Sequence, residues 1–95
     1  MQIDREQYQN RIATVVGGRG QLGSKTVKGY AELGFREVRI CEQADPFRDF
    51  VRDSTDLFFA VDAALTTDML QSARDLLRPD HAILDGASVK TSLIP

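Results

Sequence analysis

The residues best suited to chemistry in this sequence are glycines that directly follow an apolar run. They form the pattern G-x-G-x-x-G between a predicted strand and a predicted helix. In that context the first glycine permits a tight turn, the second lets the backbone approach a pyrophosphate, and the third lets the helix pack closely on the strand. Free N–H groups of the first helical turn would then face the phosphates. The arginine between the first two glycines, Arg19, could add positive charge or point to solvent. The six predicted cofactor-binding positions are Gly18, Arg19, Gly20, Gln21, Leu22 and Gly23.

An acidic residue supports this interpretation. Glu42 ends the next predicted strand and follows Gly20 by about 20 residues, as expected for the acid that binds the ribose hydroxyls of adenosine. A carboxylate at this position favours NAD as the cofactor, because it would repel the 2′-phosphate of NADP. Gln43 follows it, so Arg48 is the only nearby candidate for a phosphate-binding residue. The alternative is a glycine-rich turn in a nucleotide-type fold that no longer binds a nucleotide.

The elements that must position these residues alternate along the chain. Apolar, β-branched runs predict strands at residues 12–16, 37–42, 56–61 and 81–85. Helical periodicity predicts a helix at residues 21–33 with Gly34 just past its end, and a short helix after Asp45-Pro46. A third helix is expected to start at Thr66 or Thr67 and to stop at Pro79.

Strands that alternate with helices predict an α/β fold, in which helices cover both faces of a parallel sheet. Right-handed crossovers suggest about four strands in the order 3-2-1-4, a partial doubly wound sheet of the Rossmann type. Residues 1–11 are strongly polar and are interpreted as an N-terminal arm. Residues 12–95 are interpreted as a truncated dinucleotide-binding domain, because a complete dinucleotide enzyme needs a second domain for its substrate.

Composition limits the partners and the location. The 95 residues carry 12 Lys+Arg and 14 Asp+Glu, with scattered basic residues, so we expect no nucleic-acid partner. No apolar run approaches the roughly 18 residues of a membrane helix, and no signal-peptide pattern opens the chain. The single cysteine, Cys41, excludes an internal disulfide and a Cys-based metal site, and it fits a reducing compartment. We expect a cytoplasmic protein without metal or membrane.

Three runs of the chain resemble the prephenate dehydrogenase family, with a resemblance that covers roughly residues 12–92. They are residues 15–23 (Val-Val-Gly-Gly-Arg-Gly-Gln-Leu-Gly), 39–43 (Arg-Ile-Cys-Glu-Gln) and 83–90 (Ile-Leu-Asp-Gly-Ala-Ser-Val-Lys). The last run is the most specific, because it is similar to the family's D-x-A-S-V-K segment. The first two runs are shared more widely among NAD-dependent dehydrogenases. The bacterial enzymes fused to chorismate mutase give the closest resemblance.

This resemblance implies an NAD-dependent oxidoreductase of tyrosine biosynthesis, which is part of aromatic amino acid biosynthesis. The family oxidatively decarboxylates prephenate to 4-hydroxyphenylpyruvate: hydride passes to the nicotinamide, and the carboxylate leaves as the ring becomes aromatic. A histidine acts as general base on the substrate hydroxyl. A helical C-terminal domain supplies much of the substrate pocket and the dimer interface.

The chain departs from the family pattern at three points. The family's catalytic histidine lies downstream of the Ser-Val-Lys segment, whereas His81 precedes it and receives no catalytic role. The family's Ser-x-Pro at the end of the third strand is replaced by Ala60-Val61-Asp62, and Asp62 near a pyrophosphate would be unfavourable. No helical domain follows. We therefore assign no catalytic residue and expect an enzyme that is incomplete.

Polar residues also gather at the end of the fourth predicted strand, where open α/β sheets bind ligands. Asp85, Ser88 and Lys90 are candidates for the nicotinamide or substrate side. The alternative is that Ser88 caps a turn and Lys90 is solvated.

The fourth strand would also be an open sheet edge, which invites pairing with another chain. We expect a homodimer through this edge or through residues 89–95. A rival function is therefore a non-catalytic interaction or regulatory module that keeps the Rossmann-like fold and assembles through its edge.

Overall fold

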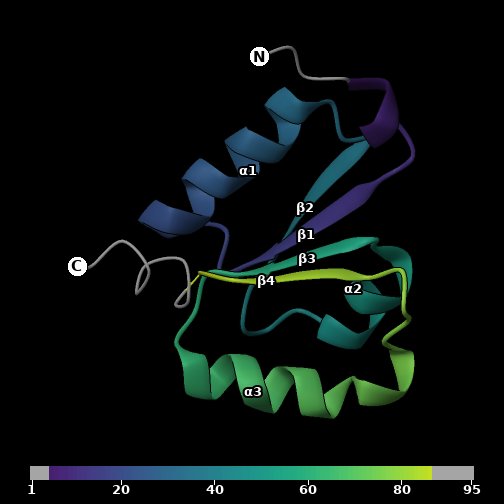
Figure 1. Cartoon of the computed structure of the whole chain (residues 1–95). Coiled ribbons are helices and arrows are strands. Elements are labelled where there is room, and N and C mark those ends of the chain that lie inside the picture. The colour runs from purple at the N-terminus through teal and green to yellow at the C-terminus, as the bar shows by residue number, and fades with distance from the viewer. Residues whose placement is uncertain (1–4, 87–95) are drawn as a thin grey trace, which may run out of the picture.

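The structure, a computed structural model, describes residues 5–86 and shows an α/β fold with one parallel sheet (Figure 1). Strands and helices alternate as the sequence predicts, and each observed element overlaps its predicted range. The elements in chain order are the 3-10 turn η1 Arg5–Tyr8, β1 Ile12–Val16, α1 Gln21–Leu33, β2 Glu37–Cys41, α2 Phe47–Asp53, β3 Asp56–Phe59, α3 Ala63–Ser72, the 3-10 turn η2 Arg74–Leu76 and β4 Ala82–Asp85.

The predicted strand order 3-2-1-4 is wrong. The observed order is β2-β1-β3-β4, so β3 pairs with β1 and not with β2. All four residues of β3 are buried, and a strand buried on both faces belongs inside a sheet. In contrast, β2 starts with the exposed Glu37 and carries Arg39, charges that suit a sheet edge. This is the other common order of doubly wound, Rossmann-like sheets, in which ligands bind where the connections after β1 and β3 diverge.

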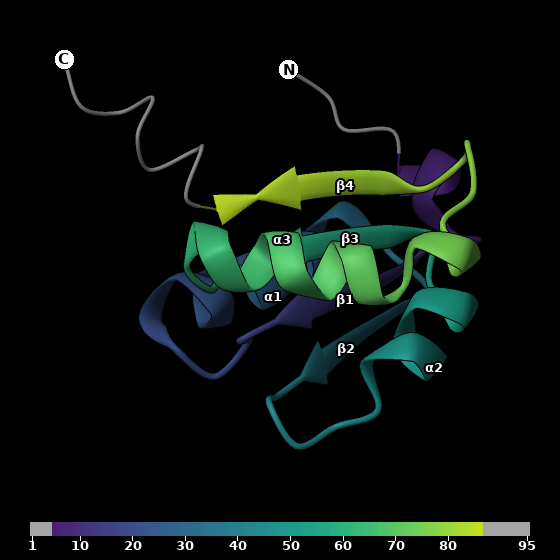
Figure 2. The same cartoon turned by 90° about the horizontal axis from the view of Figure 1, so that it is seen from below.

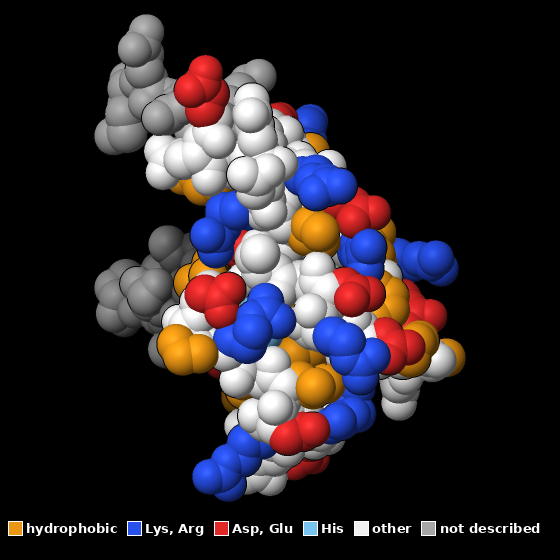
Figure 3. Space-filling view, turned by 90° about the vertical axis from the view of Figure 1, so that its right-hand side faces the viewer, with side chains coloured by type: hydrophobic (Ala, Val, Ile, Leu, Met, Phe, Trp, Pro, Cys, Tyr) orange, Lys and Arg blue, Asp and Glu red, His pale blue; other side chains and the backbone are white. Residues whose placement is uncertain are grey.

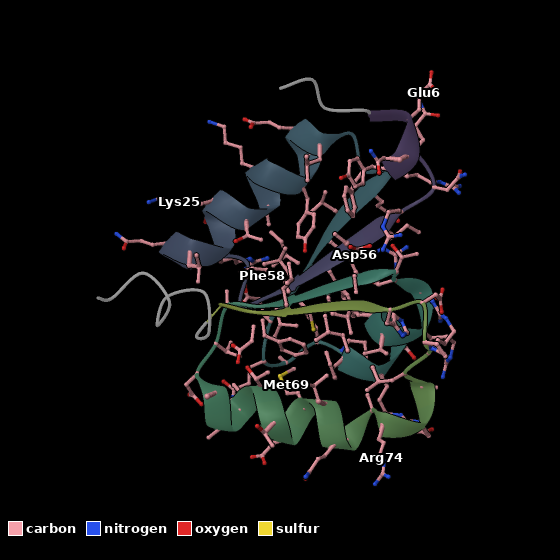
Figure 4. The ribbon with its side chains drawn as sticks, viewed as in Figure 1. Glu6, Lys25, Asp56, Phe58, Met69 and Arg74 are labelled. Carbon is pink, nitrogen blue, oxygen red and sulfur yellow. The ribbon has the colours of Figure 1, made fainter. Side chains whose placement is uncertain are left out.

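Helix α1 covers one face of the sheet, and α2 and α3 cover the other (Figures 1 and 2). Alternate residues of each strand therefore enter two separate cores. Phe58 packs toward Tyr30 of α1, whereas Met69 of α3 packs against the opposite face (Figure 4). The buried residues on the α1 side are Ala13, Val15, Tyr30 and Phe58, and those on the other side are Val16, Cys41, Val51, Leu57, Phe59 and Ala73.

Helix α3 begins earlier than the sequence predicts. Its N-cap is Asp62, whose carboxylate accepts a hydrogen bond from Leu65 N at 2.8 Å. The predicted caps, Thr66 and Thr67, lie inside the helix. Their hydroxyls donate to the carbonyls of Asp62 and Ala63, at 3.0 and 3.1 Å. Asp62 is thus the residue that sets where α3 starts.

His81 ties the amino end of β4 to the end of α2. Its Nδ1 accepts a hydrogen bond from Arg78 N at 2.8 Å, and its Nε2 lies 2.9 Å from Ser54 O and 3.1 Å from Val51 O. Because carbonyls only accept, Nε2 carries the proton in this arrangement. The neighbouring surface, at the amino ends of the strands, intermixes Lys and Arg with Asp and Glu (Figure 3). His81 is therefore a structural residue, at the end of the sheet opposite the glycine loop.

Candidate functional site

The glycine loop joins the carboxyl end of β1 to α1, and its tight turn depends on Gly17. Gly17 has a φ of +77°, and its N–H donates to Cys41 O at 2.9 Å. The motif predicts this role for Gly18, which does not have a positive φ. Position 18 requires a glycine for a different reason: a Cβ there would lie only 2.9 Å from the side chain of Ile40 in β2. The first motif glycine thus lets the loop lie against the neighbouring strand.

The other two motif glycines differ in what surrounds them. A Cβ at Gly23 would overlap Gly17 O and lie 2.6 Å from Gly18 Cα, so α1 packs on the loop as the motif predicts. A Cβ at Gly20 would meet only Gly17 O, at 3.7 Å, which is ordinary van der Waals contact. The protein itself therefore leaves space at Gly20, the position where the motif expects a phosphate to approach.

The first turn of α1 is left without a capping side chain. Gly20 is the N-cap residue, no side chain caps the helix, and its first turn contains no acidic residue. Gln21 and Leu22, its first two residues, are exposed. In α3, by contrast, the carboxylate of Asp62 fills the corresponding position. An uncapped helix N-terminus can accept an anionic ligand at its free N–H groups.

Glu42 directly follows β2 and reaches the glycine loop. Its Oε1 accepts a hydrogen bond from Arg19 N at 3.1 Å and lies 4.0 Å from Arg19 Nε. Its own backbone N–H donates to the carboxylate of Asp45 at 2.8 Å, which fixes the turn after the strand. The structure thus brings together the acid and the loop that the sequence spacing pairs. The Arg19 side chain is 81% exposed and open to a ligand.

A pocket of about 280 Å³ opens beside Glu42, between the end of β2 and helix α3. Its walls are mostly apolar with a polar rim, as is usual for small-molecule sites. The sequence motifs predict the glycine loop and the acid, but they do not predict the walls that the loop after β3 and helix α3 contribute. The available signal was the apolar spacing of Leu65 and Met69 just after a buried strand. The lining residues are Val16, Gly17, Cys41, Glu42, Gln43, Val61, Leu65 and Met69.

Cys41 forms part of the pocket floor and is fully buried. Burial, and then the nearby carboxylates of Asp45 and Glu42, raise the pKa of its thiol to about 11. A thiol with this pKa stays protonated near neutral pH, so Cys41 acts as a small apolar wall rather than as a nucleophile.

The remaining sequence candidates are not assembled at this pocket. Arg48 donates two hydrogen bonds to Asp75 and one to Ser72 O, all at 2.8 Å, so its guanidinium is held between α2 and η2. Asp85 ends β4, whereas Ser88, Lys90 and residues 89–95 lie outside the described residues. Within residues 5–86, no group of His, Cys, Asp or Glu side chains is arranged to hold a metal ion.

Searches against family models, curated proteins and solved structures find no match to this chain. Among the helices in the described part of the chain, none is both long and apolar enough to span a membrane. The structure by itself shows a Rossmann-like α/β fold with a glycine loop, an acid and a pocket at one end of its sheet.

Proposed function

We propose that this chain binds NAD at the glycine loop, as the cofactor-binding portion of an oxidoreductase similar to prephenate dehydrogenase. The observation that carries the proposal is the contact between Glu42 and the loop, where the carboxylate lies 3.1 Å from Arg19 N. A glycine motif alone is a weak signal, and a correctly placed acid makes it far more specific. The adjoining apolar pocket supplies the third feature that a nucleotide site needs.

Each part of the ligand has a matching part of the site in this proposal. The pyrophosphate lies over Gly20, where the backbone is accessible and the N-terminus of α1 favours negative charge. Glu42 binds the ribose hydroxyls of the adenosine, and the adenine ring enters the pocket beside it. NAD is favoured over NADP because a 2′-phosphate would lie against the Glu42 carboxylate, and Arg48 is held by Asp75.

The proposed role of this chain within the reaction is to bind and orient the cofactor. Bound NAD supplies the hydride acceptor for the oxidative decarboxylation that the resemblance implies. His81 does not fit the role of general base, because it lies at the amino end of β4, about 13 Å of strand away from the ligand edge. The proposal assigns no catalytic role to any residue in the range 5–86.

Titration calorimetry with NAD and NADP tests the proposal. The intact chain should bind NAD, and it should bind NADP more weakly by about tenfold or more. Gly20→Ala should abolish NAD binding, because its new methyl group occupies the phosphate approach while the backbone conformation remains allowed for alanine. Gly29→Ala is the matched control in the same helix, where the added methyl meets no atom within 4 Å.

The calorimetry has two outcomes that contradict the proposal. Absence of heat with both dinucleotides would remove the cofactor-binding function. Tighter binding of NADP than of NAD would overturn the role of Glu42. Glu42→Gln removes the negative charge of the side chain but keeps an oxygen that can accept the hydrogen bond from the loop. This variant should reduce the ratio of NAD affinity to NADP affinity.

A second candidate function is an interaction module that forms a homodimer through β4, and a specific feature of this edge favours it. The backbone of β4 is paired on one side only, with β3, and its Ile83 and Leu84 side chains are 39% and 49% exposed. Leu84 also borders an apolar groove beneath α1. In contrast, Glu37 and Arg39 pair with each other on the β2 edge. Charges commonly protect edge strands from pairing, and residues 82–84 carry none.

Sedimentation equilibrium of the full chain tests this second candidate. A dimer should form, and Leu84→Lys should convert it to a monomer by placing a charge on the edge. Glu37→Lys, at the exposed start of β2 on the opposite edge, is the control and should leave the dimer intact. A monomer at all accessible concentrations would contradict the second candidate without affecting the first.

A further inference from the structure

An apolar groove lies beside α1, on the face of the sheet that this helix covers. Helix α1 packs mainly on β1 and β2, and β4 lies beyond it at the edge of the sheet (Figure 1). Among the described residues, 5–86, α1 is the only α-helix on this face. The side chain of Leu84 is therefore 49% exposed, although its neighbour Phe58 is buried. The groove has a volume of about 210 Å³ and is lined by Thr26, Gly29, Tyr30, Leu33, Phe58 and Leu84.

The chain leaves β4 at one end of this groove. Gly86, the residue after β4, is buried beside the first turn of α1. A Cβ at Gly86 would lie 2.8 Å from Leu22 Cδ2 and 3.2 Å from the ring of Phe58. Leu22 precedes Thr26, the first groove residue of α1, by about one helical turn. The residues that follow Gly86 therefore start next to the groove, at its end nearest the glycine loop.

The next part of the sequence is apolar enough to cover the groove. Residues 87–95 lie outside the described residues and read Ala-Ser-Val-Lys-Thr-Ser-Leu-Ile-Pro. Lys90 is the only charged side chain among them. Val89 and Leu93 are four residues apart, a spacing that places two apolar side chains on the same face of a helix.

The length of this segment matches the distance along the groove. Leu93 follows Gly86 by seven residues. Gly29 follows Leu22 by the same seven residues in α1, which is a rise of about 10 Å. A helix that starts at Gly86 and runs beside α1 would thus bring Leu93 level with Gly29. The groove has room there, because a Cβ at Gly29 meets no atom within 4 Å.

We propose that residues 87–94 pack as a helix into the apolar groove beneath α1 of the same chain, with Leu93 beside Gly29. The covalent link at Gly86 gives the segment an effective concentration in the millimolar range, which favours it over a second copy of the chain. Contact between Leu93 and Leu84 removes apolar surface of both side chains from water. The segment covers the α1 face of β4 and not its backbone edge, so the proposal is independent of NAD binding and of the homodimer.

Disulfide formation between cysteines placed in the full chain tests the proposal. Gly29→Cys combined with Leu93→Cys should form an intramolecular disulfide. Lys28→Cys combined with Leu93→Cys is the matched control, because Lys28 is exposed on the same helix but does not line the groove. Both pairs keep the buried Cys41. The Gly29 pair should close about tenfold or more faster than the Lys28 pair.

Two results of this experiment would overturn the proposal. Equal rates for the two pairs would show that the segment has no preferred position beside α1. A covalent dimer as the main product of the Gly29 pair would show that the groove holds the segment of a second copy.

Amide NMR of the ¹⁵N-labelled full chain measures the same contact without added thiols. Leu93→Ser should shift the amide signals of Gly29 and Leu84, because the apolar side chain beside them is removed. Ser92→Ala changes the neighbouring residue and should leave both signals in place. Signals of Gly29 and Leu84 that stay unchanged in Leu93→Ser would overturn the proposal.

Discussion

Gly23→Ala should destabilise the fold, although alanine is the better helix former. Gly23 is the third residue of α1, and a Cβ there would overlap Gly17 O and lie 2.6 Å from Gly18 Cα. Both neighbours are backbone atoms of the loop, so neither can rotate away. The whole helix must move outward, which disturbs its packing on β1.

The magnitude follows from two opposing effects. Overpacking of this kind typically costs about 1–3 kcal/mol and occasionally more. The helix propensity of alanine returns about 1 kcal/mol relative to glycine. Since backbone atoms are involved, we take the upper end of the range and expect a net loss of about 2 kcal/mol in the free energy of unfolding. For a domain of this size such a loss lowers Tm by roughly 8–16 °C.

Urea and thermal unfolding, followed by circular dichroism, measure this change. Gly29→Ala lies in the same helix with nothing within 4 Å, and it should raise Tm by roughly 4–8 °C from propensity alone. The two variants therefore carry the same chemical change with opposite expected signs. If Gly23→Ala were as stable as Gly29→Ala, α1 would not pack on the loop, and the geometry of the site would be wrong.

Three further changes test other parts of the structure. His81→Ala should lower the free energy of unfolding by about 1–3 kcal/mol in urea titrations, because the contacts with Arg78 and Ser54 disappear; an unchanged value would contradict the structural role. Cys41 should react slowly with an alkylating reagent at pH 8, since its thiol has a pKa of about 11 and is buried, and fast labelling of the folded protein would refute this. Burial, and then the charge of Asp56, raise the pKa of Tyr30 from 10.0 to about 12. Because the folded protein therefore holds the phenol proton more tightly than the unfolded chain, the Tyr30 hydroxyl contributes to the free energy of unfolding fully below pH 10, and this contribution is lost as the pH rises toward 12. Tyr30→Phe should remove that alkaline loss of stability in unfolding titrations, and persistence of the loss would assign it to another group.

The sequence predicted the elements well because each element has a local signal. The β-branched run at β1, the αL glycine after α1 and the Asp-Pro pair before α2 act through backbone preferences within a few residues. The strand order depends instead on which strands are buried on both faces. The continuous apolar run of β3 and the charges of Glu37 and Arg39 indicate which strand lies inside the sheet and which lies at its edge. The rule that crossovers are right-handed does not contain this information, so it does not predict the strand order by itself.

The candidate site was predicted in part for the same reason. The spacing between Gly20 and Glu42 reflects one strand–helix–strand unit, so their proximity follows from local structure. The apolar walls of the pocket come from α3, which reaches the site only because β3 lies next to β1. The sequence does not predict Asp62 as the N-cap of α3, because Asp62, Thr66 and Thr67 can all cap a helix and lie within six positions. The packing of the helix selects Asp62 among them.

The most direct test of NAD binding at the glycine loop is a titration of the ¹⁵N-labelled chain with NAD, followed by amide NMR. The amide signals of Gly18, Arg19, Gly20 and Glu42 should shift together with those of the pocket wall, and the signal of His81 at the opposite end of the sheet should stay in place. A spectrum unchanged by saturating NAD, or shifts confined to the groove beside Leu84, would contradict the account.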